Sequence, residues 1–119
     1  MKAEEFLKAY ERATNSHDFS KVAPLIDDDA IYWFSDGSFE GIDAIKEAFE
    51  NTWGKVKDEV YEIKSVRWLA KSDTIAICVY EFFWQGYVDG VKKSGNGRGT
   101  NVLVNTNGSW QITHEHLSK

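Results

Sequence analysis

The chain has 119 residues, a formal net charge of -5, 42% hydrophobic residues and 14% aromatic residues. This length and apolar content predict one globular domain over residues 1–119 and argue against disorder. The acidic balance, with no basic run longer than Lys92-Lys93, argues against a nucleic-acid partner. No segment has the apolar length of a membrane span, and the single cysteine, Cys78, excludes an internal disulfide. We therefore expect a cytoplasmic protein without a membrane partner.

The first half of the chain predicts three helices and one strand. Apolar residues at helical spacing predict an amphipathic helix over residues 3–15, and a shorter helix over residues 19–25 is made irregular by Pro24. β-branched and aromatic residues predict a strand over residues 30–34. Apolar residues three and four positions apart predict a third helix from Ile42 onward.

The second half predicts only strands, over residues 61–69, 74–88, 98–105 and 109–117, with a glycine-rich loop at residues 89–97. Helices followed by an antiparallel meander predict an α+β fold, with the helices on one face of a curved sheet. A bent sheet with helices across its concave side tends to enclose a cone-shaped cavity, and small ligands bind in such concave spaces. The glycine-rich loop lacks phosphate-binding spacing and precedes no helix, so we expect it to be flexible.

The turn at Asn107-Gly108 decides which side chains of the last two strands share a face. Two-residue and three-residue loops differ by one residue in register, and that difference exchanges the faces. We prefer the three-residue loop, because it places Val102, Val104, Trp110 and Ile112 on one face and Asn101, Leu103, Gln111, Thr113 and Glu115 on the other. His114 and His116 then extend the Trp110 face, and Glu115 points away from them.

His114 and His116 allow three interpretations. They can be hydrogen-bonded histidines at a sheet edge or subunit contact, proton-transfer groups, or metal ligands. A zinc site needs at least three protein ligands, and the only other histidine, His17, is far away in the sequence. We therefore expect the structural role, with no metal and no cofactor.

Two segments carry a family resemblance, namely Glu40-Gly41-Ile42-Asp43 with Phe49–Trp53, and Thr100 with Gly108–Ser118. On these residues the chain resembles the nuclear-transport-factor-2-like superfamily, particularly its SnoaL-like members and the association domain of calcium/calmodulin-dependent protein kinase II. The resemblance implies a single SnoaL-like domain. Its fold would be a cone-shaped, cystatin-like roll of three N-terminal helices on a strongly curved, mostly antiparallel sheet. It also implies a homodimer through the sheet face, for which Tyr80, Phe82 and Trp84 would supply an exposed aromatic surface.

The kinase resemblance implies a pocket without positive charge. Positions that match its pocket arginines hold Glu81, Asn101 and Leu117, which do not suit an anionic ligand. Glu81, Asn101 and Glu115 would point into the cavity on this resemblance. Two carboxyl groups in one cavity would raise at least one pKa and provide a general base near neutral pH; alternatively, both are solvated or salt-bridged.

The first fifty residues are also similar to ketosteroid isomerase. The oxyanion-binding tyrosine of that enzyme matches Tyr10, which is otherwise a core aromatic residue. Its catalytic base matches Phe34, which cannot abstract a proton, and its second acidic donor falls near Thr100 or Asn101. This departure argues against the isomerase mechanism for the chain.

We therefore expect a small-molecule-binding domain with a largely apolar pocket. An alternative is an isomerase, cyclase or hydrolase of a small apolar substrate, with Glu81 or Glu115 as general base and Tyr10 or Asn101 stabilising an oxyanion. A second alternative is a structural oligomerisation module. The expected pocket residues are Tyr10, Tyr32, Phe34, Trp53, Glu81, Asn101 and Glu115.

Overall fold

The computed structural model describes residues 1–119. The element order is α1 (Ala3–Asn15), α2 (Phe19–Val22), the 3-10 turn η1 (Ala23–Leu25), β1 (Ile26–Phe34), β2 (Gly37–Glu40), α3 (Ile42–Lys55), β3 (Lys57–Lys71), β4 (Ile75–Val88), β5 (Val91–Thr106) and β6 (Ser109–Ser118). The three predicted helices are confirmed, and Pro24 lies in the 3-10 turn, where its missing N–H is tolerated. None of the helices combines the length and apolar character that crossing a membrane requires.

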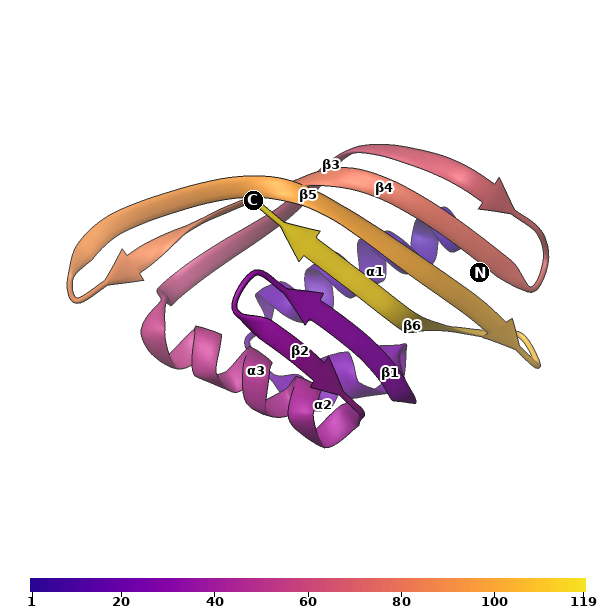
Figure 1. Cartoon of the computed structure of the whole chain (residues 1–119), viewed down its shortest axis with the longest axis horizontal. Coiled ribbons are helices and arrows are strands. Elements are labelled where there is room, and N and C mark those ends of the chain that lie inside the picture. The colour runs from indigo at the N-terminus through magenta and orange to yellow at the C-terminus, as the bar shows by residue number, and fades with distance from the viewer.

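The six strands form one sheet in the order β2-β1-β6-β5-β4-β3. All neighbouring strands are antiparallel except β1 and β6, which are parallel. Figure 1 shows the long strands β3, β4 and β5 arching over α1, with α3 beside the short strands β1 and β2. The predicted α+β roll, with helices against a curved and mostly antiparallel sheet, is confirmed.

The concave face of the sheet, which is the face toward α1, carries the hydrophobic core. Side chains alternate between buried and exposed along β4, as the two-residue period of a strand requires. Ala76, Cys78, Tyr80 and Phe82 are buried on this face. Phe6, Leu7 and Tyr10 of α1 belong to the same apolar cluster, together with Val22, Ile26, Tyr32, Ile45, Leu103 and Ile112.

Residues 89–97 form the turn of the β4–β5 hairpin and the first part of β5, so the predicted flexible loop is wrong. Asp89 and Gly90 make a two-residue turn with φ of 51° and 79°, the left-handed values that a primed hairpin turn needs. From this turn β5 pairs with β4 without interruption, from Val91 opposite Val88 to Val104 opposite Ile75. Gly95 and Gly97 of this segment are strand residues that accommodate the rings of Trp84 and Phe82 on β4.

The β5–β6 hairpin has a two-residue loop, so the predicted three-residue loop is wrong. Asn107 and Gly108 have φ of 54° and 87°, and Thr106 pairs with Ser109 across the turn. Asn105 therefore lies opposite Trp110, on the concave face.

A β-bulge then exchanges the faces of β6 halfway along the strand. Leu103 pairs with Ile112, but the preceding residue, Val102, pairs with His114, which leaves Thr113 as the extra residue. Trp110, Ile112 and Glu115 are consequently all buried on the concave face. The prediction that His114 and His116 extend the Trp110 face is wrong, whereas the opposition of Glu115 to both histidines is confirmed.

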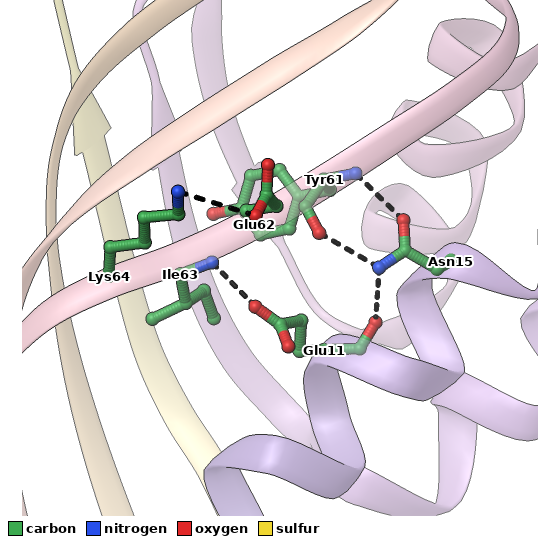
Figure 2. Close-up of polar contacts among 6 residues, drawn as sticks. All are labelled: Glu11, Asn15, Tyr61, Glu62, Ile63 and Lys64. Atoms are coloured by element: carbon green, nitrogen blue, oxygen red, sulfur yellow. Dashed lines mark hydrogen bonds and ion pairs between the residues drawn. The ribbon is translucent and has the colours of Figure 1, made fainter.

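Two side chains of α1 cover the exposed edge of the sheet at β3 (Figure 2). Asn15 accepts a hydrogen bond from the Tyr61 amide at 2.7 Å and donates to the Tyr61 carbonyl at 2.8 Å, as a neighbouring strand would. The Ile63 amide donates to Oε2 of Glu11 at 2.6 Å. These contacts satisfy edge groups that would otherwise be open to pairing with another chain, and they fix α1 against the sheet.

Replacing Asn15 by Ala should expose this edge. We expect Asn15→Ala to lower the free energy of unfolding by about 1–2 kcal/mol, because two hydrogen bonds to Tyr61 are lost. Hydrogen exchange at the Tyr61 amide should accelerate more than exchange at β5 amides. The exposed residue Asn51 of α3 gives a matched control, since Asn51→Ala should leave exchange in β3 unchanged. Unaltered Tyr61 exchange in Asn15→Ala would show that Asn15 does not hold the edge.

Candidate functional site

Six polar side chains from six different elements meet in the apolar core beneath the sheet. Each lies on the concave face of its strand or on the core side of α1. The fold thereby brings together residues that are more than 100 positions apart in the sequence. Five of them are 3% exposed or less, and the sixth, Tyr61, is half-buried with a buried hydroxyl. We call this set the polar core group: Tyr10, Tyr32, Tyr61, Tyr80, Asn101 and Glu115.

Hydrogen bonds link five members of the polar core group in two chains. The hydroxyls of Tyr10 and Tyr32 bond to each other at 2.9 Å. The Tyr80 hydroxyl donates to Oδ1 of Asn101 at 2.8 Å, and Nδ2 of Asn101 donates to Oε1 of Glu115 at 3.2 Å. Asn101 therefore joins a phenol and a carboxyl group, using both ends of one amide. Its position opposite Glu115 in the β5–β6 pairing makes this contact possible.

Glu115 is the one acidic residue in this core, and no cationic side chain accompanies it there. Burial raises the pKa of Glu115 from 4.5 to about 7, because a carboxylate loses its hydration among apolar neighbours. Polar contacts from Tyr10, Asn101 and Tyr80 partly oppose this rise. A carboxyl group with such a pKa exchanges its proton near neutral pH, as a general acid or base must.

The four tyrosines around Glu115 stay neutral over a wide pH range. Burial, followed by the negative charge of Glu115, raises the pKa of Tyr10, Tyr32, Tyr61 and Tyr80 well above the usual value of 10.0. Neutral phenols can donate hydrogen bonds to an oxygen atom. The buried Tyr61 hydroxyl makes no hydrogen bond of good geometry, although the Tyr80 hydroxyl lies close enough to oppose part of the rise in its pKa.

The concave space around the polar core group is filled by side chains, so the expected open conical cavity is not present at this point. Tyr10, Tyr32, Asn101 and Glu115 expose at most 2% of their surfaces, which leaves no room for water beside them. Two hollows lie elsewhere on the surface. One, of about 380 Å³, includes Glu62 and Phe83, and the other, of about 540 Å³, includes the N-terminus.

Glu81 lies outside the site, and its predicted place in the pocket is wrong. Its side chain is exposed on the convex face, where its cross-strand partners are Lys64 and Arg98. The buried residues are its neighbours Tyr80 and Phe82, which were expected on the exposed face. The two-residue turn at 89–90 sets this pairing and hence the facing of β4.

The aromatic dimer face expected from Tyr80, Phe82 and Trp84 is wrong for the same reason. These residues belong to the concave side, and they pack in or against the core. Exposed aromatic residues are found instead at Trp33 and Tyr87, which are 47% and 42% exposed. Homodimerisation through the sheet stays a prediction from the family resemblance.

Phe34 and Trp53 lie at the margin of the polar core group, where their contacts are with other aromatic rings. The ring of Phe34 meets Tyr32 edge-on at 5.8 Å between centroids. Trp53 contacts Phe49 at 5.6 Å, and Phe49 in turn lies 6.1 Å from Tyr32. Both predicted residues are half-buried, so they connect the surface with the buried tyrosines through aromatic contacts.

His114 and His116 lie on the convex face, away from the polar core group. Nδ1 of His114 donates to the Ile31 carbonyl at 2.7 Å, and both imidazole rings meet the ring of Trp33 edge-on. The hydrogen bond expected for His114 is present, but β6 lies between β1 and β5, so the expected position at a sheet edge is wrong. No group of three or more His, Cys, Asp or Glu side chains is arranged to hold a metal ion.

Sequence reasoning missed Tyr61 and Tyr80 as members of the site. A signal for Tyr80 was present: it shares its strand parity with Ala76 and Cys78, which are small and apolar and therefore suited to a core. Pairing β4 and β5 through Asp89-Gly90 would have placed Tyr80 diagonally beside Asn101. Tyr61 carries no comparable signal. Several bulges interrupt the pairing of β3 with β4, so the alternation of polar and apolar residues along β3 does not by itself tell which residues face the core.

Comparison with known proteins agrees with this architecture. A structure of a nuclear transport factor 2-like superfamily protein from Salmonella enterica has a TM-score of 0.86 at 17% identity, covering 96% of this chain and 85% of that chain. A calcium/calmodulin-dependent protein kinase II association-domain-like protein from Xanthomonas campestris has a TM-score of 0.83 at 21% identity, with coverages of 94% and 81%. A ketosteroid isomerase-like protein from Erwinia carotovora has a TM-score of 0.80 at 25% identity, with coverages of 98% and 92%. No curated protein sequence matches the chain. The family model for the SnoaL-like domain matches residues 3–119, and the chain therefore belongs to the SnoaL-like domain family.

Proposed function

We propose that the chain binds a small, uncharged and largely apolar molecule through the polar core group. The observation that carries this proposal is Glu115, a carboxyl group that is 2% exposed, has a pKa of about 7 and has no cationic partner. Burying such a group without a charged partner costs stability, and apolar residues surround it here. Groups that reduce stability in this way are typical of binding and catalytic sites.

The chemistry of the polar core group favours a ligand that carries a carbonyl or hydroxyl oxygen. The group contains four phenols, one amide and one carboxyl, but no lysine or arginine, so an anionic ligand would lack a counter-charge. The hydroxyl of Tyr61, which makes no hydrogen bond of good geometry, can donate to a ligand oxygen, and Glu115 can donate or accept a proton. Surrounding apolar side chains suit the rest of such a molecule.

Binding at this place requires side chains to move, because the space is filled in the structure. The half-buried aromatic residues Phe34 and Trp53 are the best candidates for that movement. They contact the buried Tyr32 directly or through Phe49, and each has one side near the surface. A ligand that displaces these rings would reach the tyrosine hydroxyls first.

Thermal unfolding in the presence of neutral ketones, phenols and alcohols tests the proposal. We expect at least one aromatic or alicyclic compound to stabilise the wild type saturably, by about 2.7 kcal/mol at a hundred times its dissociation constant. Glu115→Gln should weaken that effect, while Glu81→Gln on the exposed face should retain it. A hit that stabilises all three proteins equally would place binding outside the polar core group. The absence of any hit from a broad neutral library would count against the proposal.

General acid–base catalysis at Glu115 is the second candidate function, favoured by the pKa of about 7. The ketosteroid isomerase-like relative makes proton transfer next to a carbonyl group a reasonable first reaction to assay. If Glu115 is the base, the rate should rise with pH through about 7 and disappear in Glu115→Gln without loss of folding. Binding without turnover would support ligand binding as the only function of the site. If neither is found, a stable homodimer by light scattering would favour the structural oligomerisation module.

A further inference from the structure

Three glycines on β5 face three aromatic side chains on β4 in strict alternation. Across the hairpin, Tyr80 pairs with Gly99, Phe82 with Gly97 and Trp84 with Gly95. All of these positions are on the concave face, because they share strand parity with buried Cys78 and Asn101. None of the three glycines has a positive φ, so an L side chain would suit their backbone. The reason for glycine here must therefore be space.

The aromatic rings occupy the volume that side chains on β5 would fill. A Cβ atom on Gly99 would lie 2.3 Å from two ring carbons of Tyr80 and 2.7 Å from its hydroxyl oxygen. A Cβ on Gly95 would lie 2.5 Å from Nε1 of Trp84. Such separations are far below carbon–carbon contact distance, so each ring lies across its paired glycine.

The direction of Tyr80 across Gly99 brings its hydroxyl to Asn101. Asn101 is two residues beyond Gly99 on the same face, at the diagonal position that a long side chain reaches. There the hydroxyl donates to Oδ1 of Asn101 at 2.8 Å, while Nδ2 of Asn101 donates to Glu115. A Tyr80 ring forced away from β5 could not keep this bond.

We propose that Gly99 is a positioning residue for the polar core group: its missing side chain lets Tyr80 lie across β5 and hold Asn101 against Glu115. The inference deepens the proposed function, because it identifies what orients the amide that faces the carboxyl group. Gly95 supplies an internal comparison. It accommodates Trp84 in the same manner, but Trp84 makes no hydrogen bond to the polar core group.

A double-mutant cycle between Gly99 and Tyr80 tests the steric step. Gly99→Ala in the wild type should reduce the folded-to-unfolded ratio by roughly ten- to hundredfold, as overpacking does. In a Tyr80→Ala background the same change should have no adverse effect, since the conflicting ring is absent. If Gly99→Ala alone does not fold, recovery of folding in the double variant gives the same answer. Equal losses in both backgrounds would overturn the proposal.

Titration of the Glu115 carboxyl by carbon NMR tests the positioning step, and it requires no ligand. Gly99→Ala and the conservative Tyr80→Phe should both raise the pKa of Glu115, because both remove the support that Tyr80 gives to the carboxyl group. Gly95→Ala should affect stability but leave that pKa unchanged. Where Gly99→Ala is too unstable to titrate, the test compares the pKa of Glu115 in Tyr80→Phe with its pKa in Gly95→Ala. An unchanged pKa in Tyr80→Phe would overturn the proposal. Failure of every ligand screen would contradict the proposed function, but it would not change the measured effect of Gly99 and Tyr80 on the pKa of Glu115.

Discussion

Glu115→Gln should abolish most of the dependence of stability on pH between about 4.5 and 7. The pKa of Glu115 is raised from 4.5 to about 7 in the folded chain, chiefly by burial. The folded state therefore holds a proton that the unfolded state has already released. The resulting stability is fully present below pH 4.5 and is lost as pH rises through about 7. At 1.36 kcal/mol per pKa unit the total loss is about 3 kcal/mol.

Urea unfolding at a series of pH values between 4 and 9 measures this effect. The wild type should lose stability across the window, whereas Glu115→Gln should follow a nearly flat curve and be the more stable protein at pH 8. Glutamine keeps an oxygen that can accept the bond from Asn101. Glu81→Gln is the matched control, because that carboxyl group is exposed and its loss should not alter the slope. Parallel curves for wild type and Glu115→Gln would refute the assignment of the buried proton to Glu115.

Asn101→Leu should be among the most destabilising single substitutions in the chain, although it preserves approximate side-chain volume. It leaves the Tyr80 hydroxyl and the Glu115 carboxyl without the partner that joins them. Each unsatisfied buried polar group costs about 1–3 kcal/mol, so we expect a total loss of about 2–5 kcal/mol. Removal of the Asn101 contact should also raise the pKa of Glu115 further.

Chemical denaturation measures the stability change, and carbon NMR of the Glu115 carboxyl measures the change in pKa. Asn96→Leu provides the control on the same strand, since Asn96 is exposed and the change should remain within about 0.5 kcal/mol. If Asn101→Leu costs no more than this control, the amide does not link Tyr80 to Glu115. A large loss without any change in the Glu115 pKa would indicate general packing damage instead.

The helices and most strands were predictable from the sequence, because their signals are local. Apolar spacing fixed α1 at Ala3–Asn15, and it also located the start of α3 at Ile42. The short strand β2 and the first half of β5 were not predicted. Glycine-rich segments read as loops when their partners are unknown, yet Gly95, Gly97 and Gly99 form strand because aromatic residues of β4 cover them.

Part of the candidate site was also predictable. Tyr32 followed from its strand position and Tyr10 from the resemblance to ketosteroid isomerase, and Asn101 was expected to share a face with Glu115. The three-residue loop from which that shared face was predicted is wrong. The two-residue loop alone would have turned Glu115 outward, and the bulge at Thr113 turned it inward again.

The sequence by itself determined the fold class, the helices and, for each strand, which residues share a face. Only the tertiary structure decided which of these sets faces the helices. A strand has a period of two, so the pattern assigns residues to two faces without saying which face is buried. Turn lengths at Asp89-Gly90 and Asn107-Gly108, together with the bulge, made that choice. They exposed Glu81, buried Tyr80 and brought Glu115 into an apolar core, where the loss of hydration gives its carboxyl group a proton near neutral pH.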